Sequence, residues 1–180
     1  KVVLTGEGAD ELFAGYGRYK AAWLNEQLLI SPFWLKPILT PLLRKLGRGQ
    51  IFSQFPIGTA WDWAKAITAV SEGDLNRLLR QEWSALNKDY SPLNWLKKDR
   101  LQTLNQALAT DLQTVLPDSL LMKVDKSTMQ ASLEARVPYL NKPVVDYAFT
   151  VPAKFKLRYF KGKYLLRKVA AKYLPSSIVW

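Results

Sequence analysis

The sequence predicts a mainly α-helical protein with one β-strand at residues 2–5. Apolar residues recur at helical spacing over most of the chain. Capping residues and prolines mark the places where helices begin. Only one short apolar run, at the N-terminal end, is typical of a strand. With 180 residues, of which 48% are hydrophobic, the chain can bury one core of ordinary size.

The first element is expected to be a buried parallel strand that leads into a helix. The run Val2–Leu4 ends at Thr5-Gly6, and the helix that follows opens with Glu7, Asp10 and Glu11. An apolar strand that enters a helix through glycines is typical of a strand ending in a ligand crevice. Helix-start N–H groups favour anions there, and carboxylates in the same turn can hold Mg²⁺. The acids could instead only complement the helix dipole.

The middle of the chain is expected to be helical with two breaks. Tyr19–Leu29 continues as helix, and Ser31-Pro32 predicts a new helix with Ser31 as its cap. Pro37 and Pro41 argue against one smooth helix in that segment. Further elements are predicted as a loop over 50–59 and helices over 60–70, from Asp74 to Trp83, and from Ser91-Pro92 to about Val115.

The last third is predicted to contain three more helices. Pro117-Asp118 starts the first, with Asp118 as a cap rather than a ligand. Residues 136–140 should leave the helix, because the residue before Pro138 avoids helical backbone. Pro143 begins the second helix, and the third runs from Tyr164 to Tyr173.

Composition excludes several kinds of chemistry. The chain has neither cysteine nor histidine, which removes disulfides, Ser-His-Asp and Cys-His catalysis and the commonest zinc sites. The net charge is +11, and eight basic residues between 154 and 172 have no acid among them. They are Lys154, Lys156, Arg158, Lys161, Lys163, Arg167, Lys168 and Lys172. Such a segment is either a solvated basic face or a polyphosphate site with one or two cations turned inward.

Three blocks resemble a known family. The first runs from Thr5 to Phe13 (Thr-Gly-Glu-Gly-Ala-Asp-Glu-Leu-Phe) and continues with Gly15-Tyr16. It is similar to the Ser-Gly-Glu-Gly-Ala-Asp-Glu-Leu-Phe-x-Gly-Tyr block of glutamine-dependent asparagine synthetases, which lies in their ATP-pyrophosphatase domain. The second block, residues 116–140, and the third, Lys-Tyr-Leu-Leu-Arg at 163–167, follow in the family's order.

This chain departs from the family pattern at three positions. Thr5 replaces the usual serine and keeps the hydroxyl, and Lys126 stands where arginine is usual. Asn141 stands where aspartate is usual, so it is not assigned the role of that aspartate. The stretch from residue 20 to residue 110 adds little to the resemblance.

The resemblance implies that residues 1–180 are the helical C-terminal portion of an α/β adenine-nucleotide alpha-hydrolase-like (ATP-pyrophosphatase) domain. The family's Ser-Gly-Gly-x-Asp-Ser pyrophosphate loop and its N-terminal cysteine glutaminase domain are absent from this chain. The chain begins at Lys1 on a lone strand, whose sheet neighbours are expected upstream. We therefore expect a C-terminal fragment that is inactive as a ligase by itself.

The resemblance also implies a reaction and a set of residues. ATP and aspartate would give β-aspartyl-AMP and pyrophosphate, and ammonia from glutamine would then form asparagine. Thr5 and Gly6 would hold ATP, Glu7 would act on the acyl-adenylate, Asp10 would bind Mg²⁺, and Lys163 would neutralise charge in the transition state. The implied cofactors are ATP and Mg²⁺. The implied partners are aspartate, ammonia and the glutaminase domain, and the implied location is the cytoplasm.

Two alternatives remain open at the level of sequence. A relative of the same fold could act on another carboxylate, although Glu7 favours the asparagine version because the β-lactam-forming relative carries tyrosine there. A non-catalytic basic helical module could bind nucleic acid or a membrane surface. The leading hypothesis expects neither nucleic acid nor a membrane as partner. No uncharged apolar run approaches the ~20 residues of a membrane span. Glu134 and Arg136 could bind substrate or form an internal ion pair.

Overall fold

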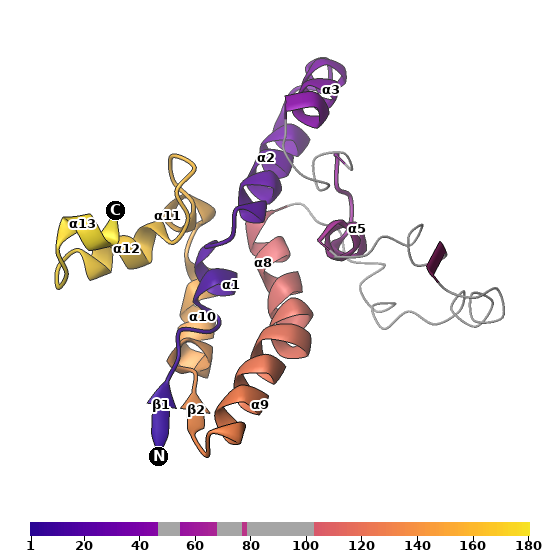
Figure 1. Ribbon diagram of the computed structural model, residues 1–180. Helices are drawn as coiled ribbons and strands as arrows, with labels where there is room; N and C mark the ends of the chain where they lie inside the picture. The colour runs from indigo at the N-terminus through magenta and orange to yellow at the C-terminus, as the bar shows by residue number, and fades with distance from the viewer. Residues whose placement is uncertain (47–54, 68–76, 79–102) are drawn as a thin grey trace. The chain divides into compact units, whose positions relative to one another are not determined.

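The computed structural model describes residues 1–46, 55–67, 77–78 and 103–180, and these are mostly helical (Figure 1). The α-helices are α1 (Ala9–Phe13), α2 (Arg18–Ile30), α3 (Lys36–Leu46), α5 (Ala60–Ala66), α8 (Leu104–Gln113), α9 (Met122–Gln130), α10 (Lys142–Thr150), α11 (Ala153–Lys156), α12 (Tyr164–Ala170) and α13 (Ser176–Val179). A π-helical segment, η2 (Leu116–Leu121), a 3₁₀ turn, η3 (Pro138–Leu140), and strands β1 (Val2–Leu4) and β2 (Glu134–Arg136) complete the described elements. The helices predicted to start at Asp74 and at Ser91-Pro92 have their starts outside the described residues.

A short parallel sheet brings the start of the first motif block next to the second motif block. β1 pairs with β2, with Val2 opposite Glu134 and Leu4 opposite Arg136. The Thr5 N–H donates to the Arg136 carbonyl at 2.9 Å and extends the pairing by one residue. The first motif block therefore lies beside the second.

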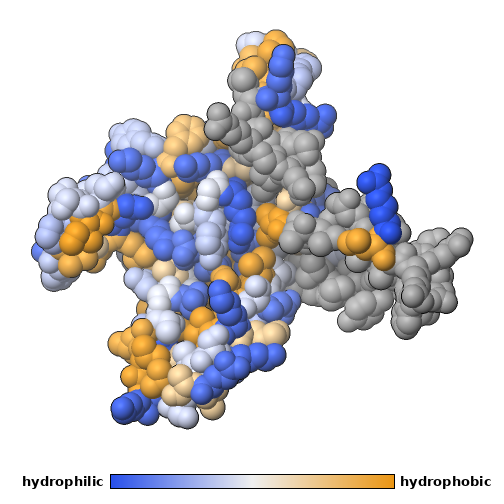
Figure 2. Space-filling view, in the orientation of Figure 1, coloured by the Kyte–Doolittle hydropathy of each residue, from blue (hydrophilic) through white to orange (hydrophobic). Residues whose placement is uncertain are grey.

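The prediction of a single, buried strand is wrong on both points. β2 was missed because it has only three residues, two of which are charged, so its period-two pattern is too short to stand out. β1 is exposed: Val2 is 53% and Leu4 70% accessible. Figure 2 shows apolar side chains on the surface where β1 lies in Figure 1.

The described residues form two compact units, one made of residues 1–24 and 103–180 and the other of the described residues between 25 and 102. In the first unit, α1 buries Leu12 and Phe13 against Ala148 of α10. Tyr139 packs edge-on to Phe13, with 6.5 Å between ring centroids, and Leu165 of α12 also packs against this cluster. Burying a side chain such as Leu12 or Phe13 contributes roughly 2 kcal/mol, so this cluster fixes α1 against α10 and α12.

A buried ion pair ties the start of α2 to α8. The Arg18 guanidinium donates to Asp111 at 2.9 Å, and the Asp111 side chain is fully buried. The same guanidinium lies over the ring of Tyr16, 4.4 Å from its centroid. α8 itself begins with a capping box in which Thr103 and Gln106 exchange hydrogen bonds.

The second unit holds α5 and the C-terminal part of α2. Thr59 and Asp62 form a capping box that starts α5, as the predicted helix over 60–70 requires. The Asn25 side chain donates to the Ile57 carbonyl and accepts from the Ile57 N–H, both at 2.9 Å. Two hydrogen bonds satisfy this buried amide and fix the loop before α5.

Two predicted caps are wrong. The Ser31 hydroxyl donates to the Leu28 carbonyl at the end of α2, and the next helix, α3, begins only at Lys36 and continues through Pro41. Asp118 lies inside η2 and makes no capping hydrogen bond. A helix does begin there, since η2 starts at Leu116 with Pro117 in its first turn, but its N-cap position is Val115, so Asp118 lies too far into the helix to cap it.

Candidate functional site

An ion pair between the first and third motif blocks lies at the centre of the candidate site. Lys163 Nζ lies 2.9 Å from Asp10 Oδ1, and each side chain is 30% exposed. Asp10 belongs to the first turn of α1, and Lys163 is the residue before the first turn of α12. The structure thus brings together two of the predicted site residues from opposite ends of the chain.

The backbone around Lys163 is held closely against α1. Lys163 adopts a left-handed conformation with φ of 54°, which is uncommon for a residue other than glycine. Its N–H donates to the Phe13 carbonyl at 2.9 Å. A Cβ atom on Gly162 would lie 2.0 Å from the Ala14 carbonyl oxygen, so only glycine allows this close approach.

Gly15 likewise allows a close approach, in this case of the Asp10 and Lys163 side chains. A Cβ atom at this position would lie 1.6 Å from Asp10 Oδ1 and 2.4 Å from Lys163 Cε. The two side chains therefore meet in space that any larger residue would fill. The sequence places Gly15 in the first motif block but does not indicate this role.

The end of β1 supplies a hydroxyl group with no partner. Thr5 Oγ1 is buried and has no hydrogen bond to the described residues. A buried hydroxyl left unpaired is unfavourable, so this atom is suited to receive a ligand. Gly6 beside it is exposed, whereas Glu7 is half-buried and forms no ion pair with a described residue.

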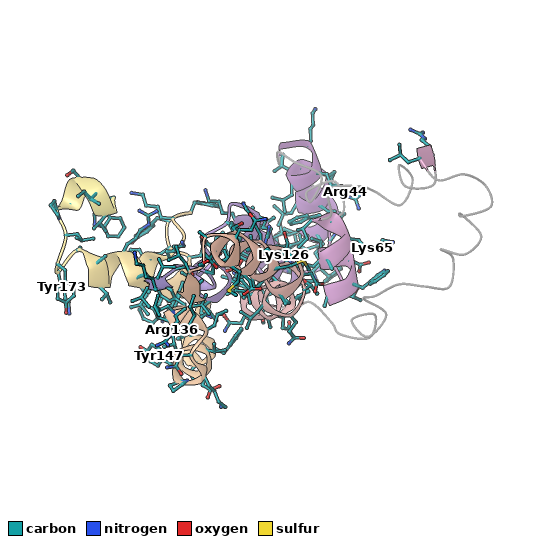
Figure 3. All side chains as sticks on the ribbon, turned by 60° about the horizontal axis from the view of Figure 1, so that its bottom comes forward. Arg44, Lys65, Lys126, Arg136, Tyr147 and Tyr173 are labelled. Atoms are coloured by element: carbon teal, nitrogen blue, oxygen red, sulfur yellow. The ribbon has the colours of Figure 1, made fainter. Side chains whose placement is uncertain are left out.

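A pocket of about 430 Å³ extends from this strand end along α12. Gly6, Lys163 and Arg167 line it with Tyr139, and apolar residues of α12 and α13 form much of the remaining wall. Thr5, Glu7 and Asp10 are not among its lining residues. Beyond the pocket, Tyr173 extends from the turn between α12 and α13 into solvent, where it is 80% exposed (Figure 3).

Glu11 does not share the setting of its neighbour Asp10. It is 1% exposed, and burial raises the pKa of its carboxyl group, as do the nearby carboxylates of Asp10 and Asp111. Burial, together with the charge of Glu11, also raises the pKa of Tyr16. Glu11 therefore lies with the acids at the helix start in sequence, but its side chain is buried and that of Asp10 is not.

The basic segment divides into five exposed cations and three that are not exposed, one more than the one or two that a polyphosphate site was expected to turn inward. Lys163 and Arg167 are half-buried, and Lys156 is fully buried. Lys156 Nζ has no hydrogen-bond partner among the described residues and lies 4.9 Å from the centroid of the Phe149 ring. Burial lowers the pKa of Lys156 to about 8. The other five basic residues of the segment are exposed.

Glu134 and Arg136 form an internal ion pair, which is one of the two roles expected for them. The other expected role was substrate binding. Arg136 Nε lies 2.8 Å from Glu134 Oε1, and both side chains are more than half exposed. The pair lies on β2, directly beside β1. An exposed pair of this kind contributes little to stability.

The donor set fits a magnesium ion held jointly with a substrate. Within the described parts of the chain, no group of three or more acidic side chains could hold a metal alone. Mg²⁺ bound with substrate phosphates takes only one or two protein carboxylates, and Asp10 offers one that is partly exposed. Among the same residues, no helix is long and apolar enough to cross a membrane.

Comparisons with known proteins agree on one family. A model described as asparagine synthase matches residues 1–180. The chain is 30% identical to asparagine synthetase [glutamine-hydrolyzing] 1 of Bacillus subtilis, over 99% of this chain and 29% of that protein. It is 36% identical to asparagine synthetase [glutamine-hydrolyzing] 3 of the same organism, over 99% of this chain and 25% of the relative. It is also 24% identical to the amidase chyE of Penicillium rubens, over 99% and 30%.

The chain thus spans less than a third of the length of these curated relatives. No solved structure matches it.

Proposed function

The chain belongs to the asparagine synthase family, and we propose that it supplies part of the active site of an ATP-dependent ligase that converts aspartate to asparagine. In this proposal residues 1–180 form the C-terminal part of the synthetase domain, consistent with the share of the relatives that they span. The remaining parts would be the pyrophosphate loop and a glutaminase domain that delivers ammonia.

The ion pair between Asp10 and Lys163 carries the proposal. A carboxylate and an ammonium group 2.9 Å apart, each partly open to solvent, are suited to a substrate that brings both a cation and an anion. Mg²⁺ with pyrophosphate is such a substrate pair. Asp10 would exchange the ammonium for Mg²⁺, and Lys163 would exchange the carboxylate for a phosphate oxygen. Neither side chain would be left unpaired before or after binding.

The two half-reactions place different demands on these residues. In the first, a carboxylate oxygen of aspartate attacks the α-phosphorus of ATP and pyrophosphate leaves. Lys163 would stabilise the negative charge that develops on the leaving group, and bound Mg²⁺ supplies a second positive charge there. In the second, ammonia attacks the activated carboxyl carbon, AMP leaves, and the nitrogen loses one proton to give the amide.

The strand end would hold the nucleotide. Thr5 would donate its unpaired hydroxyl to ATP, and the exposed Gly6 would let the ligand approach the backbone. Glu7, half-buried at the same turn, would act in forming or using the acyl-adenylate.

Aspartate-dependent exchange of labelled pyrophosphate into ATP tests the proposal. We expect the full-length protein to catalyse this exchange and to form asparagine with glutamine. Asp10→Asn and Lys163→Met should each reduce exchange by roughly 100-fold or more, because each removes one member of the charge-stabilising pair. Lys172→Met is the matched control, since Lys172 is an exposed lysine nine residues away.

Two results would contradict the proposal. Exchange that requires a different carboxylate would retain the ligase chemistry but exclude aspartate as substrate. Exchange that is unaffected by both Asp10→Asn and Lys163→Met would exclude this pair from the active site.

A further inference from the structure

We propose that Arg167 is a positioning residue that holds Lys163 at the site, and that it does so by tying the backbone before Lys163 to the C-terminal helix α13. This inference rests on the proposed function, because Lys163 is the residue whose placement matters. Arg167 lies one helical turn after Lys163 and lines the same pocket.

The Arg167 guanidinium bridges two backbone carbonyls from different segments. Its Nε donates to the Gly162 carbonyl at 3.2 Å, and its NH1 donates to the Val179 carbonyl. The Arg167 N–H donates to the Lys163 carbonyl at 2.8 Å. The peptide groups on both sides of Lys163 are thus bonded to a single residue.

An aromatic ring closes the arrangement from the outside. Trp180 follows α13, and its ring centroid lies 6.0 Å from the Arg167 guanidinium. The same ring contacts Tyr164, the residue after Lys163, with 6.0 Å between centroids. Val179, whose carbonyl accepts from Arg167, is 6% exposed. These contacts hold the end of α13 beside the start of α12.

Lys163 needs such support because its backbone conformation is unfavourable. A left-handed residue other than glycine costs about 1 kcal/mol or more and persists only where its surroundings hold it. The Phe13 carbonyl and the close approach of Gly162 hold the α1 side. Arg167 holds the other side, and within the described residues it is the side chain that bonds to this turn.

Arginine is required for this arrangement, and lysine should not replace it. The planar guanidinium presents donors in a fixed fork that can reach two carbonyls at once, whereas an ammonium group is a single centre on a flexible stem. Arg167→Lys therefore preserves the charge and removes the bridge. Displacement of a catalytic group by about 1 Å can reduce the rate by about 100-fold.

Pyrophosphate exchange by the full-length protein tests the inference through kinetics. We expect Arg167→Lys to lower kcat by roughly 10- to 100-fold and to leave the KM for ATP within about twofold. The matched control is Arg158→Lys, since Arg158 is an exposed arginine that contacts the rings of Tyr159 and Tyr164. It should change neither constant more than twofold. In a Lys163→Met background, Arg167→Lys should cause no further loss, because the residue it positions is gone.

The rate of chemical modification of Lys163 tests the inference without an enzyme assay. Lys163 acetylation by acetic anhydride, followed by mass spectrometry of the full-length protein, should be several-fold faster in Arg167→Lys than in the unmodified protein. Lys154, exposed on α11, should react equally in both.

The outcomes separate this inference from the proposed function. If the unmodified protein shows no exchange, the proposed function fails, and the Lys163 acetylation rate alone decides the positioning role. If exchange is present but Arg167→Lys retains full kcat, or if its effect multiplies with that of Lys163→Met, the inference is overturned. Should Arg167→Lys not fold, Trp180→Leu takes its place: a kcat loss that vanishes in the Lys163→Met background supports the inference, and an unchanged kcat overturns it.

Discussion

Replacing the buried Lys156 by methionine should make the protein more stable, and the gain should depend on pH. Lys156 is fully buried, and burial lowers its pKa from 10.5 to about 8. Each unit of pKa shift corresponds to about 1.4 kcal/mol, so burying the charged amine costs roughly 3 kcal/mol at pH 7. The contact with the Phe149 ring offsets about 1 kcal/mol of this. Methionine has a similar length and no charge, so Lys156→Met should raise the free energy of unfolding by roughly 2 kcal/mol.

The pH dependence follows from the direction of the shift. Below pH 8 the amine is protonated in both the folded and the unfolded chain, so the full penalty applies. Between pH 8 and 10.5 the folded chain releases the proton while the unfolded chain keeps it, so the unmodified protein gains stability as pH rises. By about pH 9.5 the penalty should fall by roughly 2 kcal/mol, to about 1 kcal/mol. Because the neutral amine no longer gains from the Phe149 ring, the advantage of the variant should shrink to about 1 kcal/mol.

Urea unfolding followed by far-ultraviolet circular dichroism at both pH values measures this difference. Lys154→Met is the matched control, because Lys154 lies on the same helix, contacts the Phe155 ring and is exposed. Its unfolding free energy should stay within about 0.5 kcal/mol of that of the unmodified protein. If Lys156→Met destabilises the protein, or if its gain is the same at both pH values, the amine is not buried as the structure shows.

Three further changes test the site and its support. Gly15→Ala should separate the Asp10–Lys163 pair and reduce pyrophosphate exchange roughly 10- to 100-fold. The control Gly17→Ala should leave exchange unchanged, because its added methyl group has no atom within 4 Å. Equal exchange rates in the two variants would contradict the close approach at Gly15. Thr5→Val should raise the KM for ATP about fivefold by removing one hydrogen bond, and Thr5→Ser should restore it; an unchanged KM in Thr5→Val would mean that the hydroxyl does not contact ATP. Asp111→Asn should lower the free energy of unfolding, measured in urea, by roughly 3 kcal/mol, because it leaves Arg18 without its buried partner. The control Asp146→Asn, which affects an exposed pair with Lys142, should cost less than about 0.5 kcal/mol. If both variants showed similarly small losses, the Asp111 pair would not be buried.

The sequence predicted those helices that have a long, regular apolar pattern or a clear starting residue. The predicted helices at 19–29 and from Pro143 onward correspond to α2 and α10, and the helix begun by Tyr164 corresponds to α12, although α12 ends three residues earlier than predicted. The Ser31 cap failed because a serine after a helix can bond backward as readily as forward, and the sequence does not show which carbonyl is nearer. β2, with three residues, is below the length at which alternation can be recognised.

The meeting of Asp10 and Lys163 could be predicted from the sequence, but the residues that support this pair could not. The motif blocks pointed to Asp10 and Lys163, and the structure places them 2.9 Å apart. The contributions of Gly15 and Arg167 depend on distances across the fold, so periodicity and spacing could not reveal them. The burial of Lys156 is also a tertiary property, since Lys154 on the same short helix is exposed.

The Arg18–Asp111 pair closes a loop of the chain, because the two residues are 93 positions apart. The entropy of closing a loop grows only with the logarithm of its length, so doubling the number of residues between these two anchors would cost about 0.6 kcal/mol. Relatives align over as many as 208 positions while matching 99% of this 180-residue chain, so they carry insertions. Extra sequence between α2 and α8, whether it arises in evolution or by design, would therefore cost little free energy of folding. The site formed by Asp10 and Lys163 could be kept while that part of the chain grows.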